Sequence, residues 1–118
     1  SHHGRNGKKL DAIAKIDRFH VEQFEEFVRR LSQQQDGEHD LLSNSMVLYG
    51  SGISDGNSHN HNDLPMLLCG EGGGAVRHRG HVAFEGRPPM ANLYLAVMRA
   101  MGCKDDRFAD STEVLPLR

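Results

Sequence analysis

Residues Tyr49 to Pro65 read Y-G-S-G-I-S-D-G-N-S-H-N-H-N-D-L-P, and this stretch decides how the rest of the chain can fold. One short apolar run, residues 46–49, precedes it, and another, residues 64–69, follows it. The stretch holds three glycines, two aspartates, two histidines and three asparagines, with Ile53 as the large apolar residue between the runs. This composition excludes a helix and predicts a polar loop between two buried strands. Such loops commonly carry the functional groups of α/β proteins.

Composition excludes two broad classes of partner. The 118 residues have a formal net charge of -2, and 37% of them are hydrophobic. Proteins that bind nucleic acid usually show clustered Lys and Arg, so we predict no nucleic-acid partner. No apolar run approaches the ~20 residues that cross a bilayer, so we predict no membrane span. The group closest to a basic patch is predicted to be solvated surface: Arg77, His78, Arg79, His81 and Arg87.

The remaining segments predict a mixed α/β domain with two helices. Apolar residues recur at helical spacing over residues 8–34, and Gly37 is expected to end that helix. Strands are expected at the two ends of segment 45–69, and a third around residues 81–84, which makes about three short strands. Residues 90–101 predict a second helix, buried on more than one face because apolar residues nearly surround it. A polar tail is expected over residues 104–118.

The histidines of the central loop indicate a metal site. His59 and His61 are two residues apart, and Asp55 and Asp63 lie within four residues of the pair. Imidazole and carboxylate groups together suit divalent ions such as Zn, Mn or Fe, and mixed sites with an open position are more often catalytic than structural. The alternative is a polar turn in which Asp55 and Asn57 bond their own backbone without any ligand.

Several motifs resemble one known family. The signature L-Y-G-S-G-I-S-D-G-N-S-H-N-H-N-D-L-P, with K-I-D-R-F-H-V-E-Q-F before it and P-M-A-N-L-Y-L and F-A-D-S-T after it, resembles the C-terminal part of a family of exported bacterial proteins. Members often carry a twin-arginine leader, and the activity of the family is unassigned. The likeness covers nearly all of the chain. It implies export, and it implies that residues 1–118 form one fragment of a larger α/β domain whose N-terminal part is missing.

That family is distantly similar to the alkaline-phosphatase and sulfatase-like hydrolases. The similarity implies a partial alkaline-phosphatase-like layered fold in which Asp55, His59 and His61 lie on a late metal-binding loop, with His3 in an earlier ligand region. It also implies a divalent metal ion (Zn, Mn, Fe or Ca) and a small phosphate or sulfate ester as substrate. Gly56 follows Asp55 here, whereas these hydrolases place Asp and His side by side at this point.

Three functions follow as expectations. The first is a metal-dependent ester hydrolase to which this chain supplies the ligands Asp55, His59 and His61, then His3 and Asp63. The nucleophile would lie outside the chain, which would be inactive alone. The second is a non-catalytic exported protein of the same fold, used in structural or surface assembly. The third is a free-standing metal-binding module.

Overall fold

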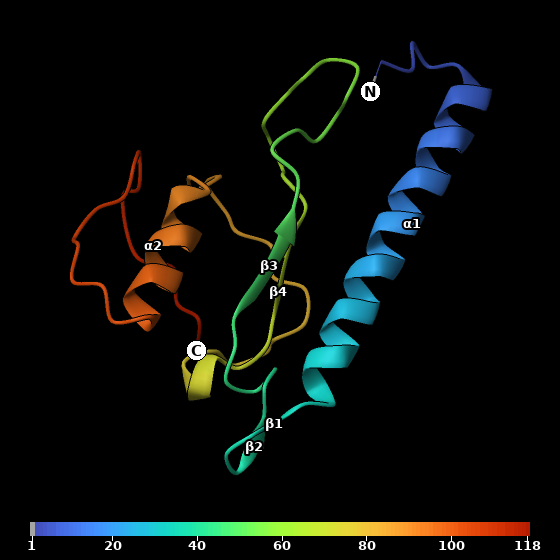
Figure 1. The fold of residues 1–118 in the computed structure, drawn as a ribbon. Helices are drawn as coiled ribbons and strands as arrows, with labels where there is room; N and C mark the ends of the chain where they lie inside the picture. The colour runs from blue at the N-terminus through green and yellow to red at the C-terminus, as the bar shows by residue number, and fades with distance from the viewer. Residues whose placement is uncertain (1) are drawn as a thin grey trace.

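The computed structural model describes residues 2–118 as two helices and two small antiparallel sheets (Figure 1). The mixed α/β class is therefore confirmed. In the described part of the chain, no helix has both the length and the apolar composition needed to cross a membrane. The elements in chain order are α1 (Gly7–Ser32), β1 (Gln35–Asp36), β2 (His39–Asp40), β3 (Val47–Gly50), β4 (Met66–Cys69), the short 3-10 helix η1 (Gly72–Gly74) and α2 (Ala91–Ala100).

The β3–β4 hairpin forms the centre of the molecule, as the two apolar runs predicted. Its strands pair antiparallel from Val47 opposite Cys69 to Gly50 opposite Met66. Gly70 ends the hairpin with a φ of +88°, and a Cβ there would lie 2.2 Å from the Ser45 carbonyl oxygen. Only glycine fits this position, because a side chain would meet backbone that cannot move aside.

Helix α1 lies along one side of this hairpin (Figure 1). It begins where the Asn6 side chain accepts a hydrogen bond from the Lys9 backbone N–H at 3.2 Å, a typical N-cap. Its contact with the sheet includes a stack of Phe24 on Tyr49, with ring centroids 4.7 Å apart. None of its 26 residues is fully buried.

The segment after α1 corrects one expectation. Gly37 does not end the helix, which stops five residues earlier at Ser32. With a φ of +65°, Gly37 instead forms the turn of the small β1–β2 hairpin, in which Asp36 pairs with His39. The two loop residues are Gly37 and Glu38, and a glycine at the first of them suits the positive φ that such tight turns require.

The third strand expected around residues 81–84 does not form, and residues 75–84 contain no strand. The described chain has four strands in two separate hairpins, not three strands in sequence. The apolar run around residues 81–84 is short, and all four of its residues are exposed. A strand needs a neighbouring edge to pair with, and this segment has none.

Helix α2 and the C-terminal tail enclose the small core. The fully buried residues of α2 lie on one face, so the expected burial on more than one face is wrong in part: Tyr94 is 39% exposed. The buried side chains of this core are those of Val76, Ala91, Asn92, Leu95, Ala96, Ser111 and Leu115.

Asn92 joins α2 to the tail. It is fully buried, and its Oδ1 accepts hydrogen bonds from the backbone N–H groups of Thr112 at 2.9 Å and Glu113 at 3.5 Å. Its Nδ2 donates to the Thr112 hydroxyl at 3.2 Å. The Asn92 side chain thus accepts hydrogen bonds from tail N–H groups that, in a helix or strand, would be paired with backbone carbonyls.

The chain exposes more surface than a compact monomer of its size. Its accessible surface is 8717 Å², whereas a compact 13.1 kDa monomer exposes about 6,400 Å². Its radius of gyration is 16.5 Å, compared with roughly 13–14 Å for a compact domain of this length. About 2,300 Å² of surface is therefore in excess.

Replacing Asn92 with Ala should lower the free energy of unfolding by about 1–3 kcal/mol, because it leaves the Thr112 N–H without its acceptor. Urea denaturation of the variant and the parent measures the difference. Asn62→Ala, at an exposed loop position, is the matched control and should change the free energy by less than about 0.5 kcal/mol. Equal losses in the two variants would show that Asn92 does not hold the tail.

Candidate metal-binding loop

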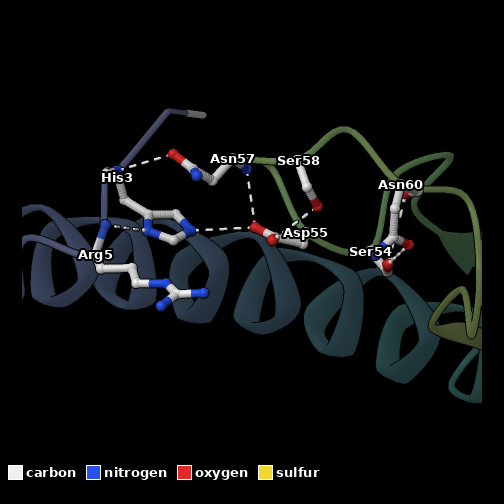
Figure 2. Close-up of polar contacts among 8 residues, drawn as sticks. His3, Arg5, Ser54, Asp55, Asn57, Ser58 and Asn60 are labelled. Carbon is white, nitrogen blue, oxygen red and sulfur yellow. Dashed lines mark hydrogen bonds and ion pairs between the residues drawn. The ribbon is translucent and has the colours of Figure 1, made fainter.

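The loop between β3 and β4 (residues 51–65) is tied to the start of the chain. Figure 2 shows the His3 ring directed at Asp55, with His3 Nε2 3.2 Å from Asp55 Oδ1. The Gly4 backbone N–H donates to Asn57 Oδ1 at 2.9 Å. These two contacts join residues more than fifty positions apart in the sequence, and they bring two of the five predicted ligands together.

The Asp55 carboxylate is also held by its own loop. Its Oδ1 accepts from the Asn57 N–H and its Oδ2 from the Ser58 hydroxyl, each at 2.9 Å. These hydrogen bonds lower the pKa of Asp55 from 3.8 to about 2. The largest contribution comes from the Asn57 N–H, followed by the hydrogen bonds from the Ser58 hydroxyl and from His3. The Asp55–Asn57 bond is the Asx-turn of the alternative interpretation, and here it coexists with the His3 contact.

The loop closes on itself around Asp55. Asp55 and Asn60 form an isolated antiparallel bridge, and the His59 N–H donates to the Asp55 carbonyl at 2.8 Å. The Ser54 hydroxyl donates to Asn60 Oδ1 at 2.5 Å (Figure 2). His59 has a φ of +54°, a left-handed conformation that is sterically unfavourable for a residue with a side chain. The hydrogen bonds of the loop stabilise it. The predicted polar loop is thus an ordered turn.

His3 is fixed in one tautomer by its neighbours. Its Nδ1 accepts a hydrogen bond from the Arg5 backbone N–H at 3.1 Å. The proton of a neutral ring therefore lies on Nε2 and is donated to Asp55. A cation bound at Nε2 would need the proton to move to Nδ1, which would break the contact with Arg5.

The other three predicted ligands do not converge with this pair. His59 is exposed and lies against His2, with ring centroids 4.6 Å apart. His61 donates from Nδ1 to the Gly52 carbonyl at 2.6 Å. Asp63 is exposed and forms no hydrogen bond or ion pair with any residue that the structure describes. Within residues 2–118, no three His, Cys, Asp or Glu side chains form a group that could hold a metal ion.

The His3–Asp55 pair nevertheless has the spacing of two ligands to one ion. Two donors at ~2.1 Å from a Zn²⁺ ion lie about 3.0–3.4 Å apart, and the observed separation is 3.2 Å. The His3 side chain is 17% exposed and that of Asp55 is 45% exposed, so the pair is reachable from solvent. The same 3.2 Å separation is that of the hydrogen bond from His3 Nε2 to Asp55 Oδ1.

Sequence reasoning missed the contacts made by His2, Gly4 and Ser58. The adjacent His2 and His3 at the start of the chain were a signal, because histidines so close together suggest a shared role. The position of this segment beside the loop depends on how α1 packs against the hairpin, which no local pattern encodes.

The glycine-rich turn at 70–74 does not form a phosphate-binding cradle. The N–H groups of Gly72, Gly73 and Gly74 donate to the carbonyls of Ser45, Ser43 and Glu71, each at 2.9 Å. They are therefore not free to bind an anion. The basic group predicted as solvated surface is exposed throughout: Arg77, His78, Arg79, His81 and Arg87.

Comparisons of the chain with protein-family models, with curated proteins and with solved structures found no match. The function must therefore be argued from the site itself.

The ionised form of Asp55 should stabilise the loop at neutral pH. Its pKa in the folded chain is about 2, below the ~3.9 of an unfolded chain, so this stabilisation is complete above about pH 4 and is lost as pH falls through about 2. The ¹³Cγ shift of Asp55, followed by NMR, should titrate near pH 2.

Ser58→Ala and His3→Ala should each raise that midpoint, because the Ser58 hydroxyl and the His3 ring both lower the pKa of Asp55. A midpoint near pH 4 in the parent chain would contradict the hydrogen bonds described for Asp55.

Proposed function

We propose that the N-terminal segment and the β3–β4 loop bind a divalent cation, with His3 Nε2 and Asp55 Oδ1 as ligands. The observation that supports this is the 3.2 Å approach of an imidazole nitrogen to a carboxylate across 52 residues of sequence. The loop bonds to Asp55 support it as well, since they hold one donor in place before an ion arrives. The choice of donors favours Zn, Mn or Fe over Ca, because Ca prefers a shell made of oxygen alone.

Two protein ligands leave most of the coordination shell open. We propose that further ligands come from a polypeptide outside these 118 residues, as the resemblance to alkaline-phosphatase-like hydrolases implies. His59, His61 and Asp63 would then serve the loop or the substrate, since each is exposed. In such a site a bound cation polarises the oxygen of a phosphate or sulfate ester.

The two hydroxyls hydrogen-bonded in the loop around Asp55 are not placed to act as nucleophiles. The hydroxyls nearest Asp55 are occupied, since Ser58 donates to Asp55 and Ser54 donates to Asn60. The Asp55 carboxylate, whose pKa is lowered to about 2, is too weak a base to activate Ser58 as a nucleophile, and the partner of Ser54 is an amide oxygen. The chain would therefore contribute ligands to a hydrolase and would be inactive alone.

A second candidate function is non-catalytic structural or surface assembly. The excess of about 2,300 Å² of exposed surface favours it, because it exceeds the ~800 Å² that each partner buries in a standard interface. In this interpretation the Asx-turn at Asp55 is scaffold, and His3 only attaches the N-terminal segment to the loop.

Mn²⁺ titration of the 118-residue chain distinguishes the two candidates. Paramagnetic broadening detects even weak binding, and we expect it to centre on the NMR signals of His3 and Asp55. Adding Zn²⁺ should also move the His3 ring proton from Nε2 to Nδ1, as seen in its ¹⁵N shifts.

The variants His3→Ala and Asp55→Asn should each weaken binding at least ~10-fold, because each removes a direct ligand. Asn at position 55 still accepts the Asn57 N–H, so the turn is kept while the charge is lost. His39→Ala, at an exposed position in β2, is the control. No localised broadening in the parent chain, or equal broadening in all variants, would favour assembly.

A further inference from the structure

A hollow lies where the C-terminal tail meets the segment that follows η1. Its volume is about 550 Å³, and it is lined by Glu71, Gly74, Val76, Arg77, His78 and Arg118. This volume is within the ~300–1,000 Å³ of small-molecule sites. Two arginines and a histidine share the hollow with one glutamate, so it is basic although the whole chain has a formal net charge of -2.

The backbone holds the two walls of the hollow together. The Arg77 N–H donates to the Leu117 carbonyl at 2.7 Å, which joins residues 40 positions apart in the sequence. Buried side chains anchor both segments, since Val76 precedes Arg77 and Leu115 lies three residues before Arg118. Two arginines from distant parts of the sequence therefore line one hollow, on backbone that packing and hydrogen bonding already fix.

Neither of these two guanidinium groups is neutralised within the described chain. The arginines that form ion pairs in residues 2–118 are Arg18, Arg29, Arg30 and Arg99. Glu71 lines the hollow as well, yet among those residues it forms no ion pair with Arg77 or Arg118. The N–H donors of both arginines therefore stay available to a ligand.

We infer that this hollow binds the phosphate group of a small phosphate ester. A guanidinium group presents a planar fork of donors that matches two phosphate oxygens. The His78 imidazole can donate one further hydrogen bond. A doubly charged phosphate also gains more from two guanidinium groups than a singly charged carboxylate does. With the Glu71 carboxylate present, the hollow suits one phosphate group and not a polyanion.

The hollow lies apart from the loop that carries Asp55. Element η1 follows Cys69 at one end of the β3–β4 hairpin, whereas the polar loop begins and ends beside the Gly50–Met66 pair at the other end (Figure 1). The inference is therefore independent of the cation site proposed above, and either one can fail without the other.

Titration with inorganic phosphate, followed by ¹H–¹⁵N NMR, tests the inference. The 118-residue chain is prepared with a C-terminal amide, so that no terminal carboxylate is added beside Arg118. Ionic strength is held constant with NaCl, because salt screens exposed charges. We expect saturable shifts between about 0.5 and 50 mM phosphate, centred on the backbone amides of Arg77, His78 and Arg118. Glycerol phosphate should bind at least as tightly, and acetate at least about threefold more weakly.

The variants Arg77→Ala and Arg118→Ala should each weaken phosphate binding at least about threefold, because each removes a charged donor. Arg77→Lys should recover only part of the loss, since lysine keeps the charge without the fork. Arg107→Ala is the matched control, because Arg107 is also exposed and forms no ion pair among residues 2–118. The same NMR spectra check that every variant stays folded.

Shifts that rise linearly without saturation would overturn the inference, because they would show no bound state. Equal weakening by Arg77→Ala and Arg107→Ala would overturn it too, since only the overall charge would then matter. So would acetate that binds as tightly as phosphate, or a hollow that takes inorganic phosphate and excludes glycerol phosphate.

Discussion

The pairing of β3 with β4 is the constraint on which the rest of the structure depends. Four residue pairs, from Val47–Cys69 to Gly50–Met66, set the separation of the two ends of the polar loop. The same strands offer one side to Phe24 of α1, while Leu48 and Met66 lie with Met90 and Tyr94 of the α2 segment around a small hollow. A two-stranded ribbon is marginally stable by itself, so the helices stabilise the strands as much as the strands position the helices.

The length of α1 links this hairpin to the candidate site. At 1.5 Å per residue the helix spans about 39 Å, and it packs on the hairpin near its C-terminal half through Phe24. Its N-terminal end therefore lies level with the loop, where Asn6 caps the helix and His3 reaches Asp55 (Figure 1). The site thus depends on a helix whose register is set by a stacked ring far from the proposed ligands.

Much of the fold could be predicted from the sequence because its signals are local. Apolar spacing predicted α1 over 8–34 and α2 over 90–101, within two residues of the observed ends. The apolar runs on each side of the polar stretch predicted β3 and β4 with a polar loop between them, and the Asx-turn at Asp55 was the alternative to a metal site. The turn of the β1–β2 hairpin contains Gly37, but Gly37 was assigned to the helix end. The strand around 81–84 was wrong because strand formation depends on a neighbour, which a short apolar run cannot reveal.

The candidate site was less predictable because its geometry is not local. His59 and His61 are close in sequence, yet one ring lies on His2 and the other on the Gly52 carbonyl. Convergence of side chains from a loop depends on its exact backbone path, here including the left-handed turn at His59. The closest pair joins His3 to Asp55, and His3 was suggested by the family resemblance and not by spacing. Metal binding by any of these residues stays a prediction.

The attachment of α1 at both ends has a thermodynamic consequence. Any contact that immobilises α1 also restricts how far His3 can move from Asp55, because only three residues separate His3 from the first turn of the helix. A partner that immobilised α1 would then alter the affinity of the loop for its ligand. By reciprocity, that ligand would alter the affinity for the partner by the same factor. The contacts of His3 and Gly4 with the loop, at the N-terminal end of α1, would in this way respond to binding anywhere along the helix.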